Sequence, residues 1–187
     1  MSHHLRHLTR SLPRSLVILR HMRSVSSDVR FISTADICDM EGDNVHYLNT
    51  QMRDFGGAKE FAGIIETVDC FEDNSKVKEA VKEDGTGKVL VVDGKGSMFR
   101  ALLGDMVAKE ALSNGWRGVV INGCIRDSVE LSGLQFGVKA LGTHPRKSLK
   151  ANQGTRQSAV EFGGCSFVPG KYIYVDADGV VVSDKVL

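Results

Sequence analysis

Short apolar runs alternate with helix-like segments through the middle of this 187-residue chain. The runs Lys88–Asp93 and Gly118–Asn122 are valine-rich and of strand length. Segments typical of helices extend from Asp105 to Asn114, where Gly115 ends the helix, and from Arg126 to Leu131. Strands that alternate with helices predict an α/β domain in which neighbouring strands run in parallel.

Further helix-like and strand-like segments flank this middle section. A short helix with a serine or threonine N-cap is expected from Ser33 to Asp39, a strand from Phe61 to Cys70 and a helix from Asn74 to Glu83. The last third is mostly strand, with strands expected at Val138–Leu141, Ala159–Val168, Tyr172–Val175 and Val180–Val182. We therefore expect a single α/β domain over residues 28–187, built on a mixed central sheet.

The composition supports a globular domain and excludes some classes of partner. The chain is 42% hydrophobic, and its apolar runs are far shorter than the roughly 20 residues that a membrane span needs. Residues 1–27 hold five arginines and no acid, which leaves 19 basic against 23 acidic side chains in residues 28–187. A net charge of −4 on the body argues against direct binding of nucleic acid. We expect neither a membrane nor a nucleic acid among the partners.

The first 27 residues form a basic extension with helical periodicity. Leucines recur on one face and arginines on another: Leu5, Leu8, Leu12, Leu16 and Leu19 against Arg6, Arg10 and Arg14. A basic, acid-free, amphipathic segment is typical of a mitochondrial transit peptide. The alternative is an extension upstream of a start at Met22, which would leave the protein in the cytoplasm.

Cysteine and histidine usage argues against a soft-metal site. The four cysteines are widely spread without a Cys-x-x-Cys pair, which favours reduced core thiols in an intracellular compartment. Only His46 and His144 lie outside the extension, so a multi-histidine zinc site is not expected.

A glycine-rich loop, Asp93–Phe99, follows the first valine-rich strand. Phe99 stands where the dinucleotide fingerprint requires its third glycine, and the Walker A spacing is absent. We interpret the loop as a tight strand exit that shapes the rim of a pocket.

Two strand-to-helix turns carry the residues best suited to chemistry. Gly104–Val107 opens a helix, and amides at a helix start can hold an anionic oxygen. Arg126 offers a bidentate fork for a carboxylate, and the neighbouring Asp127 offers hard oxygens suited to Mg²⁺ or Mn²⁺. Glu130 lies three residues later, one helical turn away, and is therefore expected on the same face as Asp127. The alternative interpretation is a surface network of ion pairs.

These motifs resemble the RraA family, the regulators of ribonuclease activity A and their class II aldolase relatives. The resemblance covers about residues 30 to 187 and is carried by Val89–Ser97, Arg100–Asp105, Asn114–Val119 and Gly123–Asp127. The aldolase signature is an aspartate, twenty residues, Arg-Asp, two residues and an acid. Asp105, Arg126, Asp127 and Glu130 match it in full, whereas Lys95 stands where a further glycine is usual.

The resemblance implies a fold and a site. The fold is an α/β/α sandwich of the swivelling-domain type, which assembles as a homotrimer with sites between subunits. Asp127 would bind the divalent cation, Mg²⁺ or Mn²⁺, in part through waters. The substrate, a small 2-oxo acid, would be held by Arg126 and by the backbone of Gly104, Asp105, Met106 and Val107. Arg126, Asp105 and Glu130 are the expected catalytic residues.

Two functions follow from the resemblance. One is metal-dependent aldol cleavage of 4-hydroxy-4-methyl-2-oxoglutarate to pyruvate, with oxaloacetate decarboxylation as a side activity. The other is non-catalytic inhibition of an RNase E-type endoribonuclease. The motifs Phe55–Gly57, Cys70–Asn74 and Phe162–Gly164 are similar to those of the regulators and favour the second function.

Overall fold

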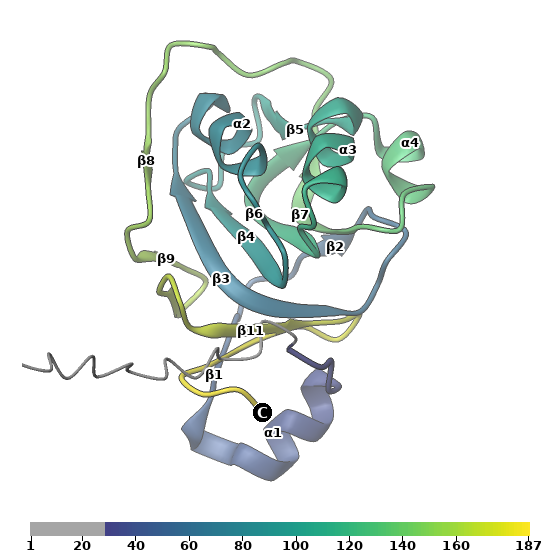
Figure 1. The fold of residues 1–187 in the computed structure, drawn as a ribbon. Helices are drawn as coiled ribbons and strands as arrows, with labels where there is room; N and C mark the ends of the chain where they lie inside the picture. The colour runs from purple at the N-terminus through teal and green to yellow at the C-terminus, as the bar shows by residue number, and fades with distance from the viewer. Residues whose placement is uncertain (1–28) are drawn as a thin grey trace, which may run out of the picture.

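The structure, a computed structural model, describes residues 29–187 (Figure 1). The basic extension of residues 1–27 and its predicted transit peptide lie outside the described residues. The helices are α1 (Thr34–Glu41), α2 (Ser75–Val81), α3 (Asp105–Ser113) and α4 (Ser128–Ser132), with a 3-10 turn at Gly42–Asn44. The strands are β1 (His46–Tyr47), β2 (Arg53–Asp54), β3 (Phe61–Asp69), β4 (Lys88–Asp93), β5 (Ala101–Leu103), β6 (Gly118–Ile125), β7 (Gly137–Thr143), β8 (Thr155–Arg156), β9 (Val160–Phe162), β10 (Cys165–Phe167), β11 (Tyr172–Val175) and β12 (Val180–Ser183).

A single mixed sheet organises the domain. Its strand order is β1-β12-β11-β3-β4-β6-β7-β2, with β5 added to β6 and β8 added to β3. Strands β3, β4, β6 and β7 are parallel, and the outer strands are antiparallel to their neighbours. The predicted α/β class and mixed central sheet are confirmed. Within the described part of the chain, no helix is long and apolar enough to cross a membrane.

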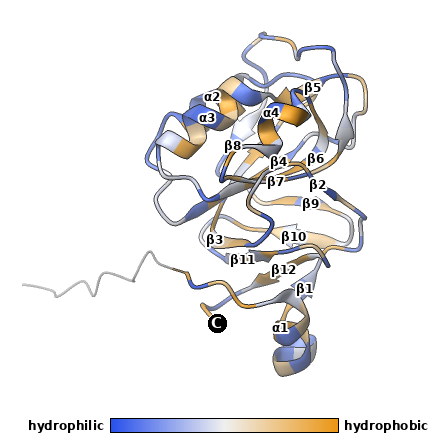
Figure 2. Cartoon of the chain, turned by 90° about the vertical axis from the view of Figure 1, so that its right-hand side faces the viewer, coloured by the Kyte–Doolittle hydropathy of each residue, from blue (hydrophilic) through white to orange (hydrophobic). Residues whose placement is uncertain are grey.

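Side chains of β3 alternate between two faces of a curled sheet. Val68 joins the core beneath α2, α3 and α4, whereas Phe61 and Ile65 point to an interior core closed by the β9–β10 hairpin. Further along the helix-bearing face, Ala62 and Tyr174 pack beside α1. Helices α2 to α4 and helix α1 therefore pack on the same, outer face of the curled sheet, at opposite ends of the molecule (Figures 1 and 2).

The two faces of the sheet are covered differently. The helices pack on the outer face, and the β9–β10 hairpin covers the inner face. Figure 2 shows hydrophilic as well as hydrophobic residues on α2 and α3, as expected for helices that bury one side and expose the other.

Local chemistry accounts for two element boundaries. The predicted serine cap of α1 is confirmed, because the Asp36 amide donates to Ser33 Oγ at 3.1 Å. The single strand predicted over residues 159–168 is wrong. Gly163 and Gly164 have φ of +56° and +74°, which favours glycine, and they turn the chain into the β9–β10 hairpin.

Two differences from the predicted elements affect the candidate site. The three-residue strand β5 was not predicted, yet it pairs with the end of β6. Helix α4 begins at Ser128 and not at Arg126, because β6 continues to Ile125 and Asp127 has left-handed backbone angles, φ 57° and ψ 42°. The later start of α4 arises because β6 is longer than its apolar run.

Candidate active site

Two parallel strand ends bring the predicted site residues together. Leu103 at the end of β5 pairs with Ile125 at the end of β6, and the Arg126 amide donates to the Leu103 carbonyl at 2.9 Å. Because the strands are parallel, the chain leaves both at the same edge of the sheet. Gly104 therefore lies beside Arg126 and Asp127, although more than twenty residues separate them in sequence.

Gly104 permits a close approach between the two turns. A Cβ atom built on Gly104 would lie 2.5 Å from Asp127 Oδ2 and 3.1 Å from Arg126 Nε. The backbone angles of Gly104, φ −140° and ψ −178°, are open to any residue. Glycine is thus needed here for space, since a side chain would displace the two functional groups.

The contacts made by Asp127 are few and long. Its Oδ2 accepts from the Asp105 amide at 3.3 Å and lies 3.4 Å from Arg126 Nε. The Arg126 and Asp127 side chains are 41% and 33% exposed. Both groups are therefore partly held and partly available to a ligand.

Asp105 is held ionised at the start of α3. Lys109, one turn later, donates to Asp105 Oδ2 at 2.7 Å. This hydrogen bond is the largest cause of a pKa below the usual aspartate value, and the Met106 amide acts in the same direction. Ionised Asp105 is suited to accept hydrogen bonds and to orient a water molecule.

A groove of about 780 Å³ extends from these turns toward α2. The residues predicted to bind substrate or metal all line it: Gly104, Asp105, Met106, Val107, Arg126 and Asp127. Its other lining residues include a set that the sequence did not indicate: Asn74, Lys78, Lys82, Lys147, Ser148 and Lys150. The groove therefore combines the predicted turns with a basic wall.

Glu130 does not accompany the other signature residues. It is exposed on α4 and does not line the groove. Asp127 precedes the helix with left-handed angles, so the expectation that the two acids share a helical face is wrong. The catalytic role of Glu130 stays a prediction.

The glycine-rich loop also lies away from the groove, so the expectation that it forms the pocket rim is wrong.

Lys95 has φ 56°, a left-handed conformation that favours glycine, which explains why glycine is usual at this position. Its ammonium donates to Asp69 at 2.7 Å and to Asp93 at 2.8 Å, and these hydrogen bonds raise the Lys95 pKa. Lys95 thus joins the ends of β3 and β4.

Carboxylates are the groups best suited to hold a metal here. Among residues 29–187, no three His, Cys, Asp or Glu side chains cluster closely enough to form a metal centre. Mg²⁺ and Mn²⁺ are often bound through one or two carboxylates, with waters completing the shell. Asp127 fits this mode, because its carboxylate is partly exposed at the groove and has only long contacts.

The cysteines take no part in the groove. All four are free, and Cys70, Cys124 and Cys165 are buried. Burial is the main cause that raises the pKa of Cys70 to about 12 and that of Cys165 to about 11. These thiols remain protonated at neutral pH, as the prediction of core thiols requires.

Comparison with known proteins identifies the family. A curated protein of Pseudomonas aeruginosa named "Putative 4-hydroxy-4-methyl-2-oxoglutarate aldolase" is 49% identical over 154 residues, which cover 82% of this chain and 95% of that protein. A Geobacillus kaustophilus structure described as an S-adenosylmethionine:2-dimethylmenaquinone methyltransferase is 49% identical with a TM-score of 0.82, covering 83% of this chain and 97% of that one. The structure of the RNA-processing inhibitor RraA from Thermus thermophilus is 36% identical with a TM-score of 0.80, covering 83% of this chain and 94% of that one. The RraA-like family model, described as Aldolase/RraA, matches residues 34–182, and the chain belongs to the RraA-like family.

Proposed function

We propose that this protein is a divalent-metal-dependent lyase that cleaves 4-hydroxy-4-methyl-2-oxoglutarate to pyruvate and also decarboxylates oxaloacetate. The relatives carry names of three different activities, so the residues of the groove must decide between them. One observation carries the proposal: Arg126 and Asp127 meet the first turn of α3 across Gly104, at the edge of the groove. The 49% identity to the aldolase-named protein of Pseudomonas aeruginosa supports it.

Substrate binding would use the positive end of the site. The 1-carboxylate and 2-oxo oxygen of a 2-oxo acid would lie between the Arg126 guanidinium and the amides at the start of α3. A guanidinium donates to such oxygens in a fixed, planar geometry, and the helix dipole adds a few tenths to about 1 kcal/mol. The bound oxo group is thus oriented with its oxygen toward Arg126.

Bond cleavage would place negative charge on that oxygen. A base removes the proton from the C4 hydroxyl, the C4–O pair forms the new carbonyl, and the C3–C4 bond breaks. Its electron pair forms the enolate of pyruvate, which is protonated at C3. Arg126 would stabilise the enolate oxygen, and Asp105, which the lowered pKa keeps ionised, would hold the water that accepts the hydroxyl proton.

Oxaloacetate would reach the same enolate by a shorter route. Its C3–C4 bond breaks with loss of CO₂, and the electron pair again passes to the 2-oxo group. No hydroxyl proton has to be removed. A single enolate-stabilising site therefore accounts for both reactions.

Mg²⁺ or Mn²⁺ is the proposed cofactor, with Asp127 as its protein ligand. When bound, the ion supplies Lewis acidity that draws electron density from the 2-oxo group. Asp127 would also keep the Arg126 guanidinium aligned through their 3.4 Å contact. Lysine Schiff-base chemistry is not required.

Pyruvate release tests the proposal. Wild-type protein with oxaloacetate and Mn²⁺ should release pyruvate, detected by a coupled dehydrogenase, above the rate of oxaloacetate with Mn²⁺ alone. EDTA should abolish the enzymatic rate and added Mn²⁺ should restore it. Activity that is insensitive to EDTA, in protein shown to be metal-free, would contradict metal dependence.

The second candidate function is inhibition of an RNase E-type endoribonuclease. The similarity to the RNA-processing inhibitor of Thermus thermophilus favours it. Co-purification of such a ribonuclease with the protein and a loss of RNA cleavage on its addition would support this function. Pyruvate release would be absent if inhibition were the only function.

We also propose that the protein forms a homotrimer. Three large apolar side chains are exposed on neighbouring segments: Phe71 at 58%, Phe99 at 70% and Leu149 at 42%. The chain brings them close, since the Leu149 amide donates to the Glu72 carbonyl and Glu72 binds Arg100. Light scattering should give three times the 20.4 kDa of one chain, and a monomeric mass would contradict the proposal.

A further inference from the structure

Four lysines from two elements other than the Arg126–Asp127 turn line the groove. Lys78 and Lys82 lie on or just after α2, and Lys147 and Lys150 lie in the loop that follows β7. None of the four forms a salt bridge with another described residue, in contrast to Lys109 of α3. We call these four residues the lysine wall.

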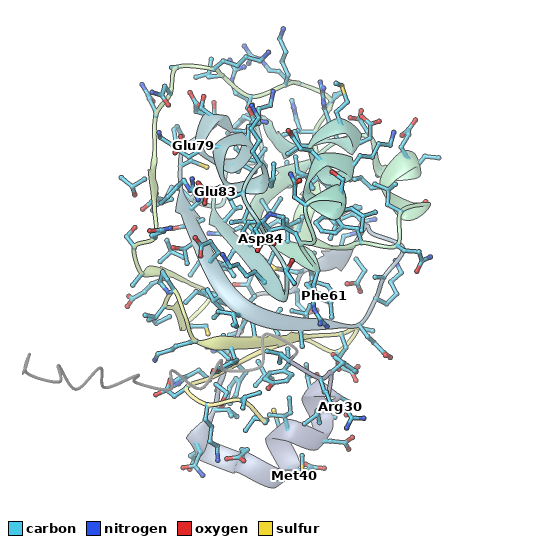
Figure 3. All side chains as sticks on the ribbon, in the orientation of Figure 1. Arg30, Met40, Phe61, Glu79, Glu83 and Asp84 are labelled. Carbon is cyan, nitrogen blue, oxygen red and sulfur yellow. The ribbon has the colours of Figure 1, made fainter. Side chains whose placement is uncertain are left out.

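The positive charge of the lysine wall is not offset by the two glutamates of the α2 region, because these glutamates form ion pairs with residues outside the wall. Glu79 and Glu83 also belong to the α2 region and are labelled in Figure 3. Arg156 binds Glu83 through two nitrogens at 2.7 Å each and contacts Glu79 at 3.3 Å. Lys76 also pairs with Glu79 at 2.8 Å, so Arg156 and Lys76 neutralise these two glutamates, whereas Lys78 and Lys82 do not contact them.

The loop half of the wall is anchored to α2. Asp73, which is fully buried, accepts from the Ser75 and Ala151 amides. The backbone of Lys147 also accepts from Arg100 at 3.0 Å and forms a bridge with Ala101 of β5. The backbone of the segment 147–151, which carries both loop lysines, is thus fixed at Lys147 and at Ala151.

Asn74 supplies a second and independent indication of a ligand. It lines the groove and is only 8% exposed. Its Nδ2 donates to the Leu102 carbonyl at 3.0 Å, but its Oδ1 has no hydrogen-bond partner among the described residues. A buried acceptor without a donor is unfavourable. A ligand hydroxyl is a group that would satisfy this acceptor.

The charge of the groove contrasts with that of the whole domain. Six cationic and three acidic side chains line it, whereas residues 28–187 carry a net charge of −4. Concave sites lined by one sign of charge concentrate oppositely charged ligands. An anion with charge at both ends fits such a groove better than a monocarboxylate.

We propose that the lysine wall binds the carboxylates on the distal, released part of the substrate. The protein would then prefer 2-oxo acids that carry one or more further carboxylates, and a hydroxyl that reaches Asn74. The inference concerns specificity and rests on the proposed function for the chemistry at the Arg126 end. Lysines serve this purpose as mobile point charges, whereas Arg126 fixes the reacting end by its planar fork.

Calorimetric binding of two probes tests the lysine wall without turnover. Tricarballylate has three carboxylates and is long enough to reach the wall, whereas oxalate is too short to extend from the Arg126 end. In the double variant Lys78→Gln/Lys147→Gln, tricarballylate should bind roughly tenfold more weakly, and oxalate affinity should change less than about twofold. Raising the salt concentration should narrow the difference between wild type and variant.

Lys171→Gln/Lys185→Gln provides the matched control. It removes the same two charges outside the groove, where Lys171 pairs with the exposed Asp184 at 2.7 Å and Lys185 pairs with Glu41 at 3.1 Å, and it should not alter binding of either probe. Equal weakening of tricarballylate in the control and in the double variant would overturn the proposal, since net charge alone would then explain the loss. Absence of tricarballylate binding to wild type would also overturn it.

The outcomes separate this inference from the proposed function. If the wild-type protein releases pyruvate but does not bind tricarballylate selectively, the proposed lyase activity is supported and the proposed role of the lysine wall is rejected. If it binds tricarballylate selectively but releases no pyruvate, the polycarboxylate subsite is supported and the proposed lyase activity is rejected.

Discussion

Two aspartates at opposite ends of the molecule show how a structural carboxylate differs from one that is available for chemistry. Asp176 is 7% exposed and accepts from the Thr34 amide and hydroxyl at 2.7 Å each, and from the Asp178 and Gly179 amides at 3.0 and 3.1 Å. Asp127 is one-third exposed and has one hydrogen bond of 3.3 Å and one ion contact of 3.4 Å.

The number of bonds decides what each group can do. Burial acts to raise the Asp176 pKa, but hydrogen bonds from Thr34, Gly179 and Asp178 outweigh it and lower the pKa. Four short bonds leave little capacity for a ligand, so Asp176 joins the α1 segment to the β11–β12 turn. Asp127 retains capacity to bind because its own contacts are long.

Arg126→Ala should have the largest effect, and on activity alone. Removing the group that stabilises the enolate oxygen is expected to lower kcat roughly 10²- to 10³-fold. The side chain is partly exposed, so the free energy of unfolding should change by about 0.5 kcal/mol or less. Steady-state pyruvate release and urea unfolding measure the two quantities. A large loss of unfolding free energy in Arg126→Ala would contradict the distinction between a residue needed for activity and a structural residue such as Asp176.

Asp176→Ala should lower the stability of the protein and leave its activity unchanged. The substitution leaves the Thr34, Asp178 and Gly179 donors without their acceptor, which is expected to cost about 2–4 kcal/mol of unfolding free energy. Below its lowered melting temperature the variant should retain the wild-type kcat.

The pH dependence of unfolding provides a second readout for Asp176. Because the folded-state pKa is depressed, Asp176 contributes stability that is complete above its unfolded-state pKa and is lost as pH falls through the folded-state pKa. The wild-type advantage over Asp176→Ala should therefore shrink in acid. A difference that is constant between neutral and acidic pH would show that the carboxylate charge is not involved.

Gly104→Ala should give a smaller effect on activity. The added Cβ meets Asp127 Oδ2 and Arg126 Nε, which are ends of side chains and can move without disturbing the backbone. We expect kcat/KM to fall on the order of tenfold through misplacement of the two groups, with nearly unchanged stability. Unchanged kinetics in a folded variant would mean that the close approach across Gly104 does not matter.

Lys109→Gln should give the smallest effect. Without its ammonium, the Asp105 pKa should rise toward the usual aspartate value, which carboxyl-carbon NMR can follow. The low-pH limb of the pyruvate-release profile should move upward with it, and kcat at neutral pH should fall only a few-fold. A shifted Asp105 titration with an unmoved activity profile would exclude Asp105 from the reaction.

Much of the fold followed from local patterns. The valine-rich runs at Lys88–Asp93 and Gly118–Asn122 became central parallel strands, and the Asp105 helix ended within a residue of its expected boundary. The short strands β1, β2, β5 and β8 were not predicted, because two or three residues carry too little periodicity. Their pairing depends on partners far away in sequence.

The site was predictable only where its chemistry lay in one motif. Arg126 and Asp127 follow a predicted strand, and Gly104 starts a predicted helix, so their residue types and position already suggested a ligand site. The lysine wall combines α2 with a distant loop, which a bridge between Leu149 and Asp73 holds beside the start of α2. No local sequence pattern encodes this pairing. The four-residue spacing of Asn74, Lys78 and Lys82 was the signal within α2 that could have indicated a shared face.

The most direct test of the central claim compares wild type with Asp127→Asn for Mn²⁺-dependent pyruvate release from oxaloacetate, beside a calorimetric titration with Mn²⁺. Asparagine preserves the size of the side chain and removes its charge, so the fold should be retained. The account predicts EDTA-sensitive turnover and Mn²⁺ binding by wild type, with both lost in Asp127→Asn at unchanged unfolding free energy. Wild-type turnover and metal affinity in a folded Asp127→Asn variant would contradict it.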